Sequence, residues 1–204
     1  MSREAELVRF NGPPRWQYYP SNARPPAHFQ DLLNQVTSMA PWFANDFWPV
    51  IYPASIPNGA PPATPHITRE LASRLPARPS ATPQHPYGLL PGWNFETRER
   101  YDPMPYLYAE GVTTEGTVNP DGAYLDVDRI TLLEIEGGGA HNNNRGTKDI
   151  VETLLIPQVD YLALMLPFRA HASQPYKYYN MIVRSLYAQQ VVQPHMKGMA
   201  VIGY

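Results

Sequence analysis

The chain has 204 residues, a formal net charge of −2 and no cysteine. The lack of cysteine excludes disulfide bonds, zinc sites with thiolate ligands and catalysis by a thiol. The small net charge creates no global field that would attract nucleic acid. No apolar run approaches the ~18 residues of a membrane span, and the first residues lack the apolar core of a cleavable signal peptide. We therefore expect a cytoplasmic or virion location.

Proline divides the chain into two parts. Nineteen of the 24 prolines lie in residues 1–105 and five lie in residues 106–204. Proline lacks an amide hydrogen and restricts the preceding residue, so long helices and central strands do not fit the first part. The sequence predicts a mainly β fold with a few short helices. Residues 1–105 would form an extended proline- and aromatic-rich arm, and residues 106–204 a compact β-rich core domain.

Two short helices are predicted within the arm. In residues 27–39, apolar side chains recur at the spacing that puts them on one helix face. Residues 64–75 begin with Thr64 as the expected cap and Pro65 at the first helical position. Both helices are short enough to fit between prolines.

The second part is rich in β-branched and aromatic residues. Strands are predicted in residues 122–136, 149–156, 159–166 and 199–204, each bounded by Gly or Pro signals. Residues 175–191 follow a helical period after Pro175, although strand alternation also fits, and we favour a helix.

The arm carries bulky aromatic residues and an arginine that suit a protein interface, because Trp, Tyr and Arg are enriched at the energetic centres of interfaces. The predicted interface residues are Trp16, Tyr18, Tyr19, Arg24, Trp42, Phe47, Trp48 and Tyr52. Packing on the chain's own core is nearly as well supported for the aromatic residues between positions 42 and 52.

A glycine-rich stretch in residues 132–156 invites comparison with phosphate-binding loops. The P-loop pattern fails at two essential positions, where His141 and Thr147 replace Gly and Lys. The dinucleotide fingerprint fails at its third glycine, which is Asn142. We predict a strand–loop–strand unit, with the 137–148 loop as a second candidate surface. Its candidate residues are His141, Asn142, Asn143, Asn144 and Arg145.

Carboxylates offer a further candidate. Along a continuous strand, Asp126, Asp128, Glu134 and Glu136 would share one face, which could hold a hard cation or simply face solvent. We favour the solvated face, and predict no metal and no cofactor. No two of the six histidines are spaced as metal ligands on a helix.

These observations favour a structural, self-assembling protein over an enzyme, such as a viral or phage capsid, coat or capsid-decorating subunit. Its partners would be copies of itself or another structural subunit, joined through the arm. One alternative is a hydrolase or lyase that uses His141 with a carboxylate such as Asp149. Another is a module that binds protein or nucleic acid. Nucleic acid is not favoured, because residues 1–105 carry nine Lys and Arg against eight Asp and Glu.

Overall fold

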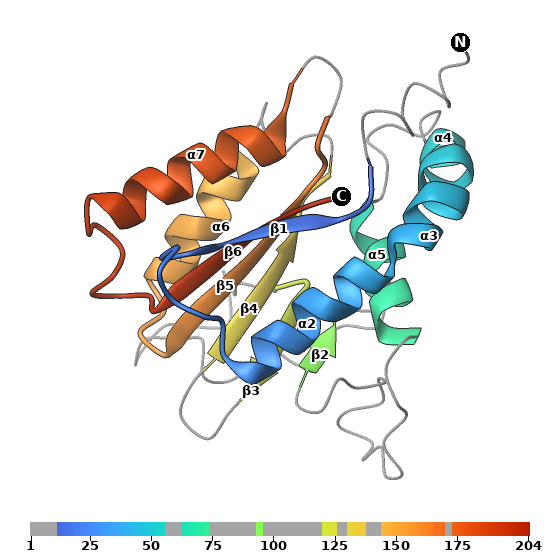
Figure 1. The fold of residues 1–204 in the computed structure, drawn as a ribbon. Coiled ribbons are helices and arrows are strands. Elements are labelled where there is room, and N and C mark those ends of the chain that lie inside the picture. The colour runs from blue at the N-terminus through green and yellow to red at the C-terminus, as the bar shows by residue number, and fades with distance from the viewer. Residues whose placement is uncertain are drawn as a thin grey trace, which may run out of the picture.

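The computed structural model describes residues 12–55, 63–73, 93–95, 120–125, 130–137, 144–169 and 173–204. These residues form a mixed six-stranded sheet in the order β1-β6-β5-β4-β3-β2 (Figure 1). The strands are β1 (Arg15–Tyr19), β2 (Trp93–Phe95), β3 (Gly122–Leu125), β4 (Ile130–Ile135), β5 (Val159–Leu166) and β6 (Gly198–Gly203). The three neighbours β4, β5 and β6 are parallel, whereas β3 is antiparallel to β4, β2 to β3, and β1 to β6.

Helices cover both faces of this sheet (Figure 1). One face carries α2 (Ala27–Ser38), α3 (Ala40–Trp42), the π-helix η1 (Phe43–Ile51), α4 (Tyr52–Ser55) and α5 (Ala63–Ser73). The other carries α6 (Arg145–Leu154), which joins β4 to β5, and α7 (Pro175–Ala188), which joins β5 to β6. Parallel neighbours require such crossovers, because a tight turn cannot return the chain to the same end of the sheet. The described residues therefore form three layers.

A sheet is present as predicted, but a mainly β fold is not. More of the described residues lie in helices than in strands, so the fold is α/β. The clearest error is the strand predicted over residues 149–156, where the chain instead continues α6. The buried residues of α6 are Gly146, Asp149, Ile150 and Thr153, which follow helical spacing. The apolar run that suggested a strand includes Val151 and Leu155, which are exposed on the outer side.

Other predicted elements are confirmed. The helix over residues 27–39 is α2, the strands over 159–166 and 199–204 are β5 and β6, and the favoured helix over 175–191 is α7. The helix predicted at 64–75 is α5, but Thr64 lies inside it and its hydroxyl donates to the Ile135 carbonyl at 2.6 Å. The segment 122–136 is not one strand, because β3 and β4 are antiparallel and Leu125 pairs with Ile130.

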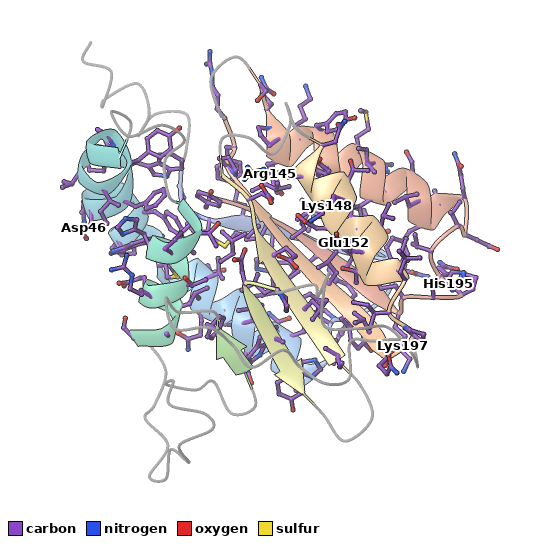
Figure 2. The ribbon with its side chains drawn as sticks, turned by 180° about the vertical axis from the view of Figure 1, so that it is seen from behind. Asp46, Arg145, Lys148, Glu152, His195 and Lys197 are labelled. Atoms are coloured by element: carbon purple, nitrogen blue, oxygen red, sulfur yellow. The ribbon has the colours of Figure 1, made fainter. Side chains whose placement is uncertain are left out.

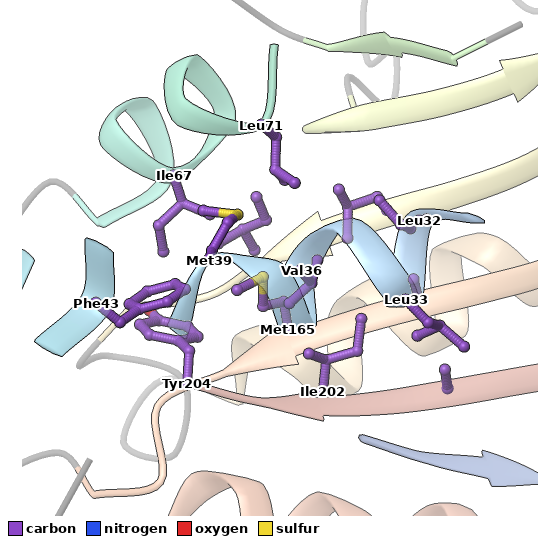
Figure 3. Packing of buried hydrophobic residues seen from close by; sticks show 14 of the residues in the cluster. Leu32, Leu33, Val36, Met39, Phe43, Ile67, Leu71, Met165, Ile202 and Tyr204 are labelled. Carbon is purple, nitrogen blue, oxygen red and sulfur yellow. The ribbon is translucent and has the colours of Figure 1, made fainter. Parts of the chain in front are cut away.

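Residues from the predicted arm build one of the two hydrophobic cores. The apolar face of α2 presents Leu32, Leu33 and Val36 to the sheet (Figure 3), and Phe29 is buried in the same core. Strands β1 and β2, from the same part of the chain, are the two edge strands. The described residues on both sides of position 105 therefore share one sheet and one core. Aromatic rings bury a large apolar area each, which favours this packing over extension into solvent.

Candidate functional site

Several charged side chains meet where β4 ends and α6 begins. Side chains alternate along β4, and Ile130 and Leu132 pack under α6 and α7, so Glu134 and Glu136 also point to that face. The antiparallel register pairs Gly122 with Leu133, which puts the preceding Asp121 beside the end of β4. Two neighbouring strands thus bring carboxyl groups to the same end of the sheet.

Hydrogen bonds to the backbone fix two of these carboxyl groups. The Asp121 Oδ2 atom accepts the amide hydrogen of Ile135 at 2.6 Å. In return, the backbone amide of Asp121 donates to the Glu134 carboxylate. Asp121 is 9% exposed, so this reciprocal pair lies inside the protein rather than on a solvated strand face.

The third component comes from α6. Asp149 lies on the sheet-facing side of the helix and is 8% exposed. Its Oδ2 atom and the Glu136 Oε2 atom are buried and have no hydrogen-bond partner among the described residues. A buried carboxylate oxygen without a partner is costly, so two of them in one cluster require an explanation.

Burial and mutual repulsion raise the pKa values of these acids. Burial, followed by the charges of Asp121 and Asp149, raises the pKa of Glu134 well above its usual range. Burial, followed by the charge of Glu136, raises the pKa of Asp149 to about 7. Burial also raises the pKa of Glu136, against the lowering effect of Arg145 and Lys148. The cluster therefore favours protons, or an added cation, over free negative charge.

Basic side chains surround the same end of the sheet. Arg145 and Lys148 lie on the first turns of α6, and both are exposed (Figure 2). Arg169 follows the end of β5. On the edge strand, Arg15 pairs with the last residue of β6, and its guanidinium lies 4.8 Å from the centre of the Phe168 ring. Arg145 and Lys148 are close enough to lower the pKa of Glu136, whereas Arg15 and Arg169 share with the acids only the same end of the sheet.

The structure separates the predicted interface residues into two groups. Tyr18, Tyr19, Phe47, Trp48 and Tyr52 are buried in the cores of the same chain. Trp16 and Trp42 are partly buried against the first core, and Arg24 is exposed. This favours the alternative in which aromatic residues 42–52 pack in cis. Their use in an interface stays a prediction.

The predicted loop is only partly described. His141, Asn142 and Asn143 lie outside the described residues, as do Asp126 and Asp128. Asn144 directly precedes α6 with a φ of 51°, and Arg145 is the first residue of the helix. A helix therefore follows the glycine-rich stretch, contrary to the predicted strand–loop–strand unit.

Asp121 and the grouping with Asp149 were missed from sequence alone. The Glu-Ile-Glu spacing of residues 134–136 already places two carboxylates on one strand face. Asp121 could have been placed beside these carboxylates only if a hairpin had been predicted between β3 and β4. Asp149 required α6 to be recognised as a helix.

Within the described part of the chain, no three His, Asp or Glu side chains form a group that could hold a metal ion by themselves. No helix there is both long and apolar enough to cross a membrane. Comparison of the chain with protein-family models, curated proteins and solved structures finds no match.

Proposed function

We propose that this protein is a hydrolase of phosphodiester bonds, acting on nucleic acid with the help of a divalent cation such as Mg²⁺. The observation that carries the proposal is the meeting of Asp121, Glu134 and Asp149 beside Lys148. Glu134 lies on β4, Asp121 directly precedes the neighbouring strand β3, and Asp149 and Lys148 lie on α6, the helix that follows β4. The buried, unpartnered Asp149 Oδ2 atom is a second observation that supports the proposal, because it leaves this carboxylate able to accept a hydrogen bond from a water molecule.

The donor set fits Mg²⁺ better than a closed metal site. Mg²⁺ is commonly held by one or two carboxylates, with water and substrate phosphate as the other ligands. Asp121 and Glu134 would provide those carboxylates. When bound, the ion would polarise the phosphate and lower the pKa of a bound water.

The remaining acids and bases have roles in such a reaction. A pKa of about 7 allows Asp149 to accept a proton from an attacking water near neutral pH. Lys148 neighbours this carboxylate and can contact a phosphate oxygen as a point charge. Its present partner is Glu152, at 3.0 Å on the helix surface, where an ion pair is weak enough to exchange.

The basic residues around the site favour a polyanionic substrate. Arg15, Arg145 and Arg169 occupy the same end of the sheet as the carboxyl cluster. Contacts to a phosphate backbone come largely from Arg and Lys and depend on local positive charge. The net charge of −2 describes the whole chain and does not oppose a basic rim around one site.

Cleavage of nucleic acid tests the proposal directly. Purified full-length protein is incubated with plasmid DNA and with single-stranded RNA, with Mg²⁺ or Mn²⁺ and with EDTA. We expect cleavage that requires the cation, and a loss of about 100-fold or more in Glu134→Gln. Asp46→Asn is the matched control, because Asp46 is an exposed acid on η1, across the sheet from α6 (Figure 2). Absence of cation-dependent cleavage, or equal cleavage by both variants, would refute the proposal.

Self-assembly is a second candidate, supported by a different surface from the predicted arm. Val151 on α6 and Leu155 directly after this helix are 49% and 75% exposed, and Met181 on α7 is 61% exposed. Apolar side chains exposed on outer helix faces can mark protein contacts. We propose that any virion or other assembly uses this surface. Light scattering on the full chain and on Leu155→Glu tests it, since a wild-type monomer of 23.1 kDa would exclude self-assembly.

A further inference from the structure

The first turn of α6 lacks a cap from its own sequence. Asn144 adopts a left-handed conformation, and no side chain at that position caps the helix. The first amide groups of a helix have no partner within the helix, so an uncapped start is weakly held. Here a residue from another helix fills the gap. The Thr147 amide donates to the Tyr179 hydroxyl of α7 at 3.1 Å.

Close approach of the two helices depends on Gly146. A Cβ atom at this position would lie 2.8 Å from Cζ of Tyr179, closer than two carbon atoms can pack. Tyr179 is fully buried, so its ring has little room to move aside. The glycine therefore allows the ring to lie against the turn and bring its hydroxyl to the Thr147 amide.

This turn carries the charged groups of the site. Arg145 and Lys148 flank the contact, and Asp149 follows on the buried side of α6. The side-chain positions of Lys148 and Asp149 are set by the position of this turn over β4. We infer that Tyr179 is a positioning residue that holds the first turn of α6, and with it Lys148 and Asp149, over the end of β4. The catalytic consequence rests on the proposed function, whereas the contact itself does not.

The test removes the hydroxyl alone. Tyr179→Phe keeps the ring and deletes the acceptor of the Thr147 amide. Tyr187→Phe is the matched control, because Tyr187 lies two turns further along the same helix and is also buried. Its hydroxyl lies 3.5 Å from the Met196 carbonyl, away from α6. Amide hydrogen exchange across α6 and the kinetics of plasmid cleavage are measured for the wild type and both variants, and urea unfolding checks that all three are equally folded.

We expect exchange of the Thr147 amide to rise about tenfold in Tyr179→Phe and to stay unchanged in Tyr187→Phe. In the same variant kcat should fall about tenfold while KM for DNA changes little, because the outer basic residues still bind substrate. Unchanged exchange, or an equal loss of kcat in both variants, would overturn the inference. If exchange of the Thr147 amide rises but kcat stays unchanged, the hydroxyl caps the turn but does not position the site. That result also overturns the inference. If the wild type cleaves nothing, the proposed function fails, and the exchange of the amide still decides whether Tyr179 holds the turn.

Discussion

Replacing Asp149 by Asn should stabilise the protein at alkaline pH. In the folded state burial and the Glu136 charge raise the pKa of Asp149 from 3.8 to about 7. A carboxyl group with a raised folded pKa contributes stability that is fully present below its unfolded pKa. That contribution is lost as the pH rises through the folded pKa. The loss therefore occurs between about pH 4 and pH 7.

The size of this effect follows from the shift. A difference of about three pH units corresponds to roughly 4 kcal/mol at 1.36 kcal/mol per unit. Solvent near the exposed first turn of α6 screens the charge and reduces this free energy, so we expect an effect of about 2 kcal/mol. Asn removes the ionisable group, and the bond from the Thr153 hydroxyl to the backbone carbonyl of residue 149, 2.6 Å long, does not involve the altered side chain.

Urea unfolding of both proteins at about pH 4.5 and about pH 8 measures the prediction. Asp149→Asn should be more stable than the wild type by about 2 kcal/mol at the higher pH and nearly equal to it at the lower pH. Added Mg²⁺ should narrow the stability difference at the higher pH, because a cation held by Asp121 and Glu134 would offset the charge of the neighbouring Asp149. An equal difference in the free energy of unfolding at both pH values would refute the reasoning, since the other acids change the stability of both proteins alike.

Two further pairs of substitutions test the packing of the cores. Trp48→Ala should lower the free energy of unfolding by about 3–5 kcal/mol, because Trp48 is fully buried. Trp42→Ala should lower it clearly less, since Trp42 is only partly buried. Urea unfolding measures both variants. Gly198→Ala should cost about 1–3 kcal/mol or more, because its Cβ would overlap the Tyr18 hydroxyl, whereas Gly12→Ala has nothing within 4 Å and should be neutral in thermal melts.

Elements were predicted correctly where the pattern of their own residues is sufficient to determine the structure. The helix α2 has a regular apolar face, and residues 162–166 of β5 form a continuous apolar run that is buried, so each was found from its residues alone. The failure at α6 has a different cause. Its apolar residues suit a strand or a helix, and the choice is made by the parallel pairing of β4 with β5, which requires a crossover.

The candidate site could be predicted only in part for the same reason. Glu134 and Glu136 were recognised as neighbours on one strand face, because that follows from alternation alone. Their partial burial was not, since it depends on the cover provided by α6. Asp121 joins them through the antiparallel register of β3, which is a long-range property. A single sequence contains no direct record of such pairings.

The packing of the aromatic residues explains how the protein can tolerate a cluster of repelling acids. The Tyr204 hydroxyl donates to the backbone carbonyl of Glu136 at 2.8 Å, and Tyr204 is fully buried. Its ring lies 5.7 Å from Trp48 and 5.4 Å from Phe43, which come from η1 in the proline-rich part. The aromatic core thus holds the end of β4 from the face opposite α6. Burial of these large rings offsets the cost of unpaired carboxylates, so the abundance of aromatic residues in the first part supports the site from within the same chain.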